Sequence, residues 1–483
     1  MTSKAVLEAT GRVRPALTPA VVALGGIPAA FAEAGHQLAL VGGCVRDAAL
    51  GRVGNDLDLT TDAPPERVRQ LLRGEVEALW ETGIRFGTVG ARRAGYQIEI
   101  TTFRAESYAP DSRKPTVAFG TELVEDLARR DFTINAMAVR LPTGELDDPF
   151  GGMPDLVAGL LRTPGPPEVS FGDDPLRMLR AARFVSQLGV RIEPATLAAI
   201  GDMALRLEIV SAERVRDELV KLILGPHAAD GVRVMVDTGL ADIVLPEVPA
   251  LSLEIDEHRR HKDVYQHSLT VLEQAIALET SHDPVLEPDF TLRFAALLHD
   301  IGKPRTRRFT SDGVSFHHHE VVGAKMTRKR MRDLRFSNEQ VDEVSRLVEL
   351  HLRFHGYGGG EWSDAAVRRY VRDAGPLLSR LHKLTRADCT TRNRRRAAAL
   401  QASYDDLERR IDVLAQAEEL DAMRPELDGT QIMAILGIPP GPAVGRAYRH
   451  LLELRLERGL LGPDQAEVEL RRWWEQQARP SPE

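Results

Sequence analysis

The hydrophobic pattern of the chain changes once, across the turn-rich segment 161–175, and this change limits the folds that the chain can adopt. Before it, residues 38–150 carry short apolar runs separated by Gly, Asp and Pro, a pattern typical of strands with helices between them. After it, apolar residues follow a helical period almost to the C-terminus. The sequence therefore predicts an α+β head, a small mixed sheet with helices, followed by all-helical domains.

The 483 residues are too many for one ordinary hydrophobic core, and their number favours roughly three domains. Breaks rich in Gly and Pro at 245–258, 356–363 and 437–442 are candidate boundaries or loops. The predicted division has five parts: an N-terminal helical segment 1–35, the head 36–165, a helical neck 166–255, a helical domain 256–395 and a C-terminal helical region 396–483.

Composition narrows the class of protein. Apolar residues make up 43% and charged residues 28%, which is ordinary for a folded globular chain. The two cysteines, Cys44 and Cys389, are far apart and exclude a disulfide framework or a thiolate zinc site. The apolar stretch 16–34 is broken by Pro and Glu, so we expect a cytoplasmic protein without a membrane partner. The net charge of −8 argues against a uniformly basic nucleic-acid binder, although local basic patches still count.

Three carboxylates fall on predicted strands. Asp56 and Asp58 are two residues apart, so both point to one face while Leu57 and Leu59 face the core. Glu99 lies on the polar face of a second strand. Close carboxylates repel unless a cation neutralises them, and oxygen ligands beside phosphates select Mg²⁺. The alternative is an ordinary solvent-exposed strand face.

A Gly pair precedes these carboxylates. Gly42 and Gly43 lie between a predicted strand and a predicted helix, where backbone amides can approach a triphosphate. Turn chemistry alone is the alternative, because short motifs often match by chance.

The Gly pair followed by Asp-Leu-Asp resembles the DNA polymerase β-type nucleotidyltransferase superfamily. Further segments are similar, in order and spacing, to class II CCA-adding enzymes and bacterial poly(A) polymerases: RRDFTINAMA (129–138), DPFGG (148–152), DDPLRMLRAARF (173–184) and SAERVRDELVKLIL (211–224). The resemblance runs from about residue 38 to 390 and implies a nucleotidyltransferase head followed by an RNA-binding neck.

The resemblance implies a two-metal mechanism. Asp56 and Asp58 would hold Mg²⁺ on the triphosphate while the RNA 3′-hydroxyl attacks the α-phosphorus, and Glu99 would help to seat the second ion. Such a displacement needs positioning and charge neutralisation, so no side-chain nucleophile is expected. Arg46 and Asp47 match the VRD of the family, where they either support the phosphates or form a structural pair.

Other family positions surround the nucleotide. Arg130, Asp131 and Asn135 match RRDxxxNA, which in the family surrounds the sugar, and their polar groups suit a 2′-hydroxyl. A self-satisfied turn network is the alternative. Arg180, in the DDPLRMLRAARF segment, is also expected to bind nucleotide.

Asp174 and Arg177 correspond to the residues with which the family reads the incoming base. Cytosine and adenine both present an amine beside an unprotonated ring nitrogen, which suits a carboxylate next to a guanidinium. Uracil and guanine would leave both contacts unpaired, at about 1–3 kcal/mol each. Asp173 stands where the family commonly has Glu. An N-cap with an ordinary ion pair is the alternative.

Between Arg104 and Arg129, a segment rich in Pro, Gly and charge predicts an exposed loop near the active site. In the family, such a loop is linked to the switch from C to A addition.

A second constellation resembles the HD phosphohydrolases. Its six matching positions are His267, His299, Asp300, His319, His351 and Asp388. Imidazoles with carboxylates suit Mn, Fe, Ni or Co better than Mg. His317 and His318 are expected to face solvent. Many relatives keep this domain only as a scaffold, so both an active metal site and an inert one stay open.

Three functions compete. Addition of CCA to tRNA from CTP and ATP comes first, poly(A) polymerase second, and an HD phosphohydrolase with a merely binding head third. Basic groups at 177–183, 325–335 and 392–396 suit RNA phosphates, with solvated helix faces as the alternative. The C-terminus is mixed in charge rather than strongly basic, which favours folded tRNA over unstructured RNA. The oligomeric state, monomer or homodimer, is open.

Overall fold

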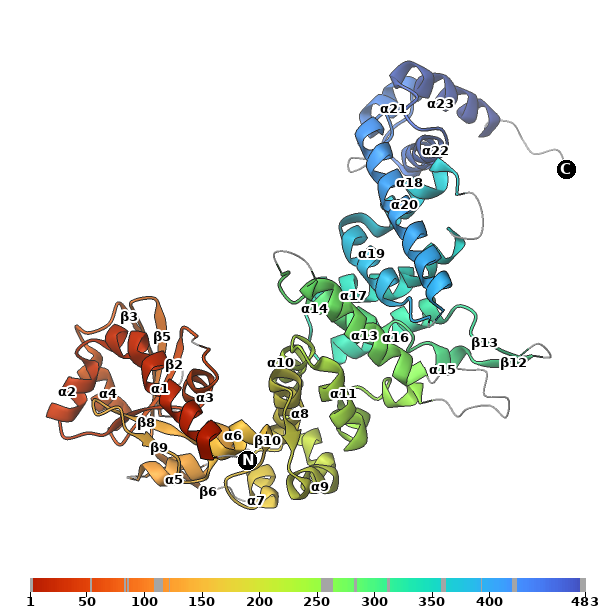
Figure 1. The fold of residues 1–483 in the computed structure, drawn as a ribbon. Helices are drawn as coiled ribbons and strands as arrows, with labels where there is room; N and C mark the ends of the chain where they lie inside the picture. The colour runs from red at the N-terminus through yellow and green to blue at the C-terminus, as the bar shows by residue number, and fades with distance from the viewer. Residues whose placement is uncertain are drawn as a thin grey trace. The chain divides into compact units, whose positions relative to one another are not determined.

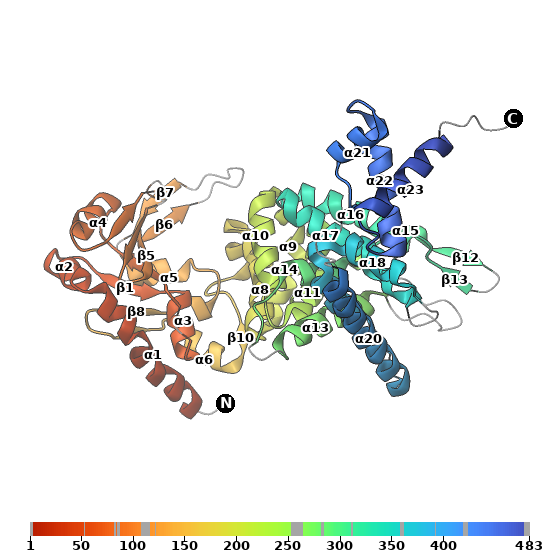
Figure 2. The same cartoon turned by 90° about the horizontal axis from the view of Figure 1, so that it is seen from above.

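The computed structural model describes residues 3–52, 54–81, 84, 87–107, 116–120, 122–252, 264–281, 285–310, 313–357, 362–391, 393–418 and 424–477. The chain forms two compact units, Met1–Pro246 and Glu247–Glu483. Figures 1 and 2 show the large sheet in the first unit and a predominantly helical second unit. The predicted α+β head followed by helical domains is confirmed. The finer five-part division stays a prediction.

A seven-stranded mixed sheet forms the centre of the head, in the order β3-β4-β5-β2-β1-β8-β9. Its strands are β1 (Leu38–Val41), β2 (Asp56–Thr61), β3 (Ala78–Trp80), β4 (Thr88–Arg93), β5 (Tyr96–Thr102), β8 (Ala138–Leu141) and β9 (Leu146–Asp147). The neighbours β2 and β5 run parallel, whereas the other pairs are antiparallel. Residues of β2 and β5 alternate between buried and more exposed along much of their length, as the sequence pattern predicts.

Helices cover the sheet and follow it in the chain: α1 (Ser3–Leu24), α2 (Ile27–Glu33), α3 (Gly43–Ala49), α4 (Pro65–Leu72), α5 (Leu123–Ala128), the 3₁₀ turn η2 (Thr133–Asn135) and α6 (Gly152–Ala158). α3 contacts β1 and β2, and α4 contacts β4 and β5. Fully buried aromatic residues, among them Phe31, Phe103 and Phe132, fill the core of this unit. Burial of these large apolar side chains stabilises the sheet whose central strands β2 and β5 carry the carboxylates.

The segment predicted as a loop after Arg104 contains a hairpin instead. Its strands β6 (Arg104–Ser107) and β7 (Thr116–Phe119) pair antiparallel. Residues 108–115, between the two strands, lie outside the described residues. The pairing of the two strands satisfies their backbone hydrogen-bond donors and acceptors. The content of Pro and charged residues, on which the loop prediction depended, does not indicate such pairing.

The remainder of the first unit is helical apart from the short parallel pair β10 (Leu160–Leu161) and β11 (Arg191–Ile192). It contains α7 (Pro167–Asp173), α8 (Leu176–Leu188), α9 (Pro194–Met203), η3 (Ala204–Ile209), α10 (Ala212–Ile223), α11 (Ala228–Asp237) and α12 (Leu240–Val244). α8 packs between α10 and α11, so its residues connect the head with the neck.

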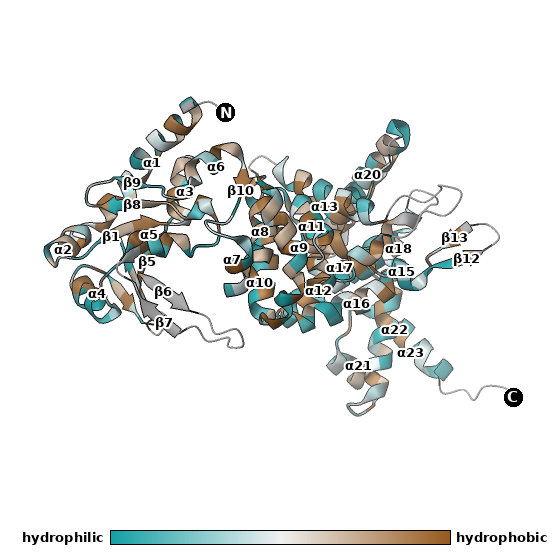
Figure 3. Cartoon of the chain, turned by 90° about the horizontal axis from the view of Figure 1, so that it is seen from below, coloured by the Kyte–Doolittle hydropathy of each residue, from teal (hydrophilic) through white to brown (hydrophobic). Residues whose placement is uncertain are grey.

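The second unit begins with η4 (Pro249–Leu251), α13 (Val264–Thr280), α14 (Phe290–Leu298), α15 (Lys303–Thr306), the hairpin β12 (Arg308–Thr310) and β13 (Gly313–Ser315), α16 (His319–Asp333), α17 (Asn338–Leu350), η5 (His351–Gly356), α18 (Asp364–Ala374), η6 (Gly375–Leu377) and α19 (Leu378–Ala387). It ends with α20 (Arg394–Glu418), α21 (Gly429–Leu436), α22 (Pro442–Arg458) and α23 (Pro463–Gln477). The last three helices share a separate apolar cluster that includes Ile432, Leu451 and Leu470. Figure 3 shows hydrophilic and hydrophobic stretches side by side on most helices, as amphipathic packing requires.

Within the described residues, no single helix has the length and apolar character to cross a membrane. α1 and α2 meet these two criteria only together, and the chain bends by 79° where they join.

Candidate active site

Three carboxylates gather at one face of the sheet. Asp56 and Asp58 come from β2, and the parallel register sets Asp58 beside Glu99 of β5. Burial, reinforced by the charge of Asp56, raises the pKa of Asp58 against the opposing pull of Arg130. Burial and the two aspartates likewise raise the pKa of Glu99. A cation among these oxygens would relieve that repulsion, so the donor set fits a divalent ion.

The carboxylates line a cavity of about 580 Å³. Its other lining residues are Gly43, Arg46, Leu57, Gln97, Asn135, Arg180, Arg183, Phe184 and Lys221. A cavity lined by both acids and cations suits a polyanion that also carries a metal ion, such as a nucleoside triphosphate.

A chain of hydrogen bonds orders the cationic side of the cavity. Arg46 holds Asp47 through Nε and Nη2, each 2.9 Å from a carboxylate oxygen, and donates from Nη1 to Asn135 Oδ1 at 2.8 Å. Asn135 Nδ2 donates to Asp131 at 2.9 Å, and Arg180 binds the other oxygen of Asp131 at 2.9 Å from Nε. Burial would raise the pKa of Asp131, but Arg180 and Asn135 bring it below its ordinary value. Two of the three predicted sugar-site residues, Asp131 and Asn135, therefore belong to one connected network, whereas the third, Arg130, bonds to Asp126.

The Gly pair lies directly beside the carboxylates. Gly42 has φ 73° and stands at the N-terminus of α3. A Cβ atom there would lie 3.0 Å from Arg130 Nη1 and 3.8 Å from Asp58 Oδ2. Arg130 itself donates from Nη2 to Asp126 at 3.2 Å. Both the left-handed backbone and the close approach require glycine at position 42.

The two predicted base-reading residues have other partners. Asp174 Oδ2 lies 2.7 Å from Arg214 Nη2. Arg177 donates from Nη2 to the backbone carbonyl of Arg129 at 2.6 Å and from Nη1 to Ser170 Oγ at 2.8 Å. Among the described residues that line the 580 Å³ cavity, neither Asp174 nor Arg177 occurs. The ordinary ion pair between Asp174 and Arg177, the alternative weighed from the sequence, is also not formed by these side chains.

Sequence reasoning did not assign five of the lining residues to the site: Leu57, which was expected to face the core, and Gln97, Arg183, Phe184 and Lys221. Arg183, Phe184 and Lys221 belong to the segments that carry the family resemblance, yet no motif position marked them. Arg183 Nε lies 2.8 Å from Glu218 Oε2, and its guanidinium lies 4.2 Å from the centre of the Phe184 ring. Burial, helped by the neighbouring Arg180, lowers the pKa of Arg183 to about 10. The signal available in the sequence was helical spacing, since Arg180 and Arg183 are three residues apart.

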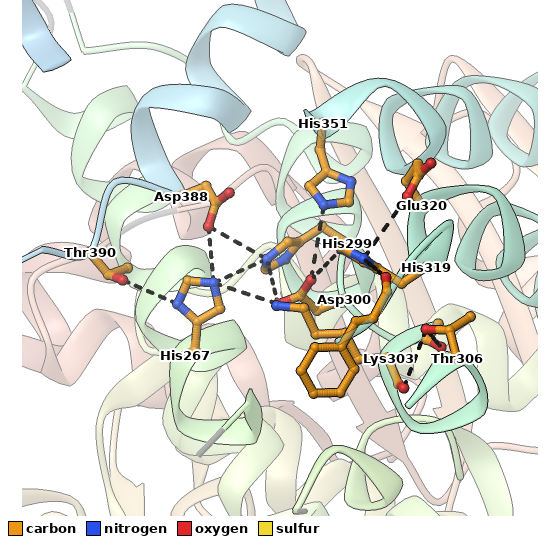
Figure 4. Close-up of polar contacts among 12 residues, drawn as sticks. His267, His299, Asp300, Lys303, Thr306, His319, Glu320, His351, Asp388 and Thr390 are labelled. Carbon is orange, nitrogen blue, oxygen red and sulfur yellow. Dashed lines mark hydrogen bonds and ion pairs between the residues drawn. The ribbon is translucent and has the colours of Figure 1, made fainter. Parts of the chain in front are cut away.

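The six predicted HD residues meet in the second unit (Figure 4). They come from five places: His267 in α13, His299 and Asp300 after α14, His319 at the start of α16, His351 after α17 and Asp388 after α19. Two ligand groups result, one of His267, His299 and Asp388 and one of Asp300, His319 and His351. His267 Nε2 lies 2.9 Å from Asp388 Oδ1, and His319 Nε2 lies 3.2 Å from Asp300 Oδ1.

The imidazoles are oriented for metal binding. In His299, His319 and His351, Nδ1 lies 2.8, 2.8 and 2.7 Å from the backbone carbonyl three residues earlier. In His267, Nδ1 lies 3.2 Å from Thr390 Oγ1. Each ring thereby turns Nε2 toward the centre (Figure 4). Among the described residues the buried Nε2 of His351 forms no hydrogen bond, and it lies 3.9 Å from Asp300 Oδ1. This outer support is the arrangement by which proteins orient metal-ligating histidines, so the residues fit a bound ion.

The two neighbouring histidines, His317 and His318, are exposed as expected. His299 and His351 differ in charge preference. Burial would lower the pKa of His299, but Asp300 raises it above its ordinary value. Burial lowers the pKa of His351 to about 3, which keeps that ring neutral and able to donate its lone pair to a metal.

Three family models match successive parts of the chain. The poly A polymerase head domain matches residues 38–162, the probable RNA and SrmB-binding site of polymerase A matches 189–251, and the HD domain matches 264–393. The head and HD matches imply use of divalent metals.

Curated proteins and solved structures extend these matches. An A-adding tRNA nucleotidyltransferase of Deinococcus radiodurans is 34% identical over 91% of this chain and 96% of its own length. A CCA-adding enzyme of Lactobacillus helveticus is 45% identical to this chain. The matched part covers 44% of this chain and 52% of that enzyme. The crystal structure of the Bacillus stearothermophilus CCA-adding enzyme in complex with CTP has a TM-score of 0.68 at 25% identity, covering 96% of this chain and 98% of that one.

Proposed function

Because this chain belongs to the tRNA nucleotidyltransferase family of CCA-adding enzymes, we propose that it completes the 3′ end of tRNA with CMP and AMP taken from CTP and ATP. The observation that carries the proposal is the cavity lined both by Asp56, Asp58 and Glu99 and by four cationic side chains. This arrangement serves transfer of a nucleotide from a triphosphate rather than binding alone.

Asp56, Asp58 and Glu99 would hold Mg²⁺, which when bound neutralises the triphosphate and polarises its phosphorus. Arg46 and Arg180 supply guanidinium groups for phosphate oxygens, and the support of Asp47 and Asp131 holds those groups in place. Asn135, already bonded to Arg46 and Asp131, is placed to bind the sugar. Preorganised charge of this kind stabilises the transition state of phosphoryl transfer.

Asp174 and Arg177 would select C and A by accepting from the exocyclic amine and donating to the ring nitrogen. In the structure Asp174 pairs with Arg214, and Arg177 donates to Ser170 and to the backbone carbonyl of Arg129. Base reading therefore requires Arg177 to exchange these partners when a nucleotide enters, while Asp174 Oδ2 can accept a further bond.

Addition of A alone is the second candidate function. It is favoured by one observation, the match to an A-adding tRNA nucleotidyltransferase over 96% of that protein's length. Poly(A) addition, which uses the same head motifs, is the third outcome that an experiment must separate. The cytoplasm and the oligomeric state stay predictions.

The HD centre would supply a second activity, hydrolysis of a phosphate ester. Six converging ligands support this, among them His351, whose buried Nε2 forms no hydrogen bond with a described residue. Mn, Fe, Ni and Co suit its imidazole-rich donor set. Replacing His351 with Ala should abolish binding of Mn²⁺ by the second unit, measured by calorimetry, and leave nucleotide addition by the head unchanged.

The decisive experiment supplies the purified protein and its Asp56→Ala/Asp58→Ala variant with Mg²⁺ and tRNA. One tRNA ends at the discriminator base and a second already ends in CC, and labelled CTP and ATP are given separately and together. Sequenced products that stop at CCA, and that are lost in the variant, support the proposal. Extension only of the CC-ending tRNA by one A indicates the A-adding alternative, and long A tails indicate poly(A) polymerase.

A further inference from the structure

A short hairpin lies in the chain between two residues of the HD centre, Asp300 and His319. α15 follows Asp300 almost directly and leads into β12, and β13 returns the chain to Phe316 and His319. At the base of the hairpin, Lys303 Nζ lies 2.6 Å from Asp300 Oδ2 and 5.8 Å from the centre of the Phe316 ring. Figures 1 and 2 show β12 and β13 projecting outward from the helices of the second unit. Whatever binds the hairpin therefore lies next to the HD centre.

α15 and the start of the hairpin carry three arginines close together in the sequence. Counting only described carboxylates, no ion pair reaches the three arginines that follow Lys303, namely Arg305, Arg307 and Arg308. By contrast, the exposed cations Lys329 and Arg409 pair with acids of their own helices. Unpaired guanidinium groups in a row suit phosphates, which Arg binds through two donors.

An aromatic ring stands among these arginines. Phe309 is 70% exposed, although most large apolar side chains of this unit are buried. The guanidinium of Arg307 lies 4.6 Å from the centre of its ring, and Arg307 Nε is shielded from solvent without a hydrogen-bond partner. An exposed ring beside guanidinium groups is the surface on which single-stranded nucleic acids stack their bases.

We propose that the β12–β13 hairpin binds the single-stranded end of an RNA and presents its terminal phosphate to the HD centre. A base stacks on Phe309, the arginines bind the following phosphates, and Lys303 receives the terminal one. By helical and strand rise, Phe309 and Lys303 are on the order of 10–15 Å apart, a span of a few nucleotides. An acidic peptide would pair with the arginines but would leave the exposed ring without a partner.

The inference rests on the proposed phosphohydrolase activity and names its substrate class. In that reaction a water oxygen bonds to phosphorus and the ester P–O bond breaks. The RNA leaves with a hydroxyl group, which takes up a proton of the water, and inorganic phosphate is released.

Binding is tested first, with a fluorescein-labelled ten-nucleotide single-stranded RNA that ends in a 3′-phosphate. Fluorescence anisotropy should show a Kd raised roughly tenfold by Phe309→Ala and restored by Phe309→Trp, since stacking needs only an aromatic face. The triple change Arg305→Gln, Arg307→Gln and Arg308→Gln should reduce the slope of log Kd against log salt by about 2.

A second triple variant is the matched control. Lys4→Gln, Arg409→Gln and Arg471→Gln remove the same charge from exposed positions whose partners lie in their own helices and which lie outside the basic groups named from the sequence. Its Kd should stay near that of the original protein. Equal weakening by both triple variants, or an unchanged Kd in Phe309→Ala, would overturn the proposal.

Measurements of phosphate release and of nucleotide addition distinguish a failure of the hairpin proposal from a failure of the phosphohydrolase function on which it rests. With Mn²⁺ present, the hairpin variants should release phosphate from the RNA more slowly, while addition of CMP and AMP to tRNA by the head continues. Loss of nucleotide addition in the hairpin variants would mean that the hairpin serves the head, and the proposal would be wrong. If the original protein releases phosphate from p-nitrophenyl phosphate but not from RNA, the hairpin proposal is also wrong. If it releases phosphate from neither substrate, the phosphohydrolase function itself is wrong.

Discussion

Single residues of the head show how the site is held before any ligand arrives. Asp131 accepts hydrogen bonds from Asn135 and Arg180. Gly42, which has no side chain, leaves space for Arg130 beside Asp58. Each of these residues acts by placing another, so substitutions should change geometry and protonation rather than remove a reacting group.

Replacing Gly42 with Ala should impair the head. The φ of 73° costs an L-residue roughly 1–2 kcal/mol, and the new methyl group would press on Arg130 Nη1 at 3.0 Å. We expect at least a tenfold fall in kcat/KM for CTP and for ATP, measured by incorporation into tRNA. Gly445→Ala, in the first turn of α22 with no atom within 4 Å of the new Cβ, is the control and should be neutral or slightly stabilising. Equal activity of the two variants would contradict the assigned role of Gly42.

Asp131→Asn should make the head less stable in a pH-dependent way. The pKa of Asp131 is lower in the folded protein than the ordinary value near 4, because Arg180 and Asn135 overcome the effect of burial. Its contribution is therefore complete above about pH 4 and is lost as pH falls through the lower, folded-state pKa. Urea unfolding followed by circular dichroism should show a deficit of about 1–3 kcal/mol in Asp131→Asn at pH 7. The deficit should shrink between pH 4 and pH 2.5, and a constant deficit would refute the linkage.

At the level of secondary-structure elements, both sites depend on close packing between neighbours. The parallel pair β2 and β5 brings two distant segments into register, so Asp58 faces Glu99. In the second unit, α15 approaches the start of α16 so closely that a Cβ on Gly302 would lie 2.0 Å from the backbone oxygen of His319. The orientation of His319 therefore depends on the absence of a side chain at Gly302.

Gly302→Ala should accordingly disable the HD centre without affecting the head. The methyl group has no space against backbone atoms of His319 and Gly323, so α16 must shift and carry His319 away from Asp300. Calorimetric titration with Mn²⁺ should show binding weakened at least tenfold. Nucleotide addition to tRNA is the internal control and should be retained. Unchanged Mn²⁺ affinity would show that His319 is not a required ligand.

At the level of the whole molecule, each unit holds one complete site. The cavity of the head is lined by residues 43–221, all before Pro246. The HD residues run from His267 to Asp388, all after Glu247. Neither site borrows a described residue from the other unit.

The two units should therefore keep their ligand affinities when produced separately. Residues 1–246 should bind CTP with Mg²⁺ within about threefold of the full chain, and residues 247–483 should bind Mn²⁺ equally well. Isothermal titration of the three proteins checks both expectations, with circular dichroism confirming that each part is folded. A folded fragment that fails to bind its ligand would show that the site needs the other unit.

The sequence by itself determined the α+β head, the helical remainder, the three carboxylates and the six HD positions. These depend on local signals: strand alternation places Asp56 and Asp58 on one face, and ordered motifs carry their spacing along the chain. These signals depend only on the order and spacing of residues along the chain, so they can be read without knowing which distant segments are in contact.

Only the tertiary structure decided which side chains meet. Asp174 turned to Arg214, forty residues away, instead of its helical neighbour Arg177. Arg183, Phe184 and Lys221 reached the cavity because α8 packs against α10, and the segment after Arg104 formed a hairpin. Partner choice depends on the relative distance and burial of groups that are remote in sequence. The Asp174–Arg214 pair is partly exposed, so the distance set by the packing of these segments, and not deep burial, decides which partner Asp174 takes.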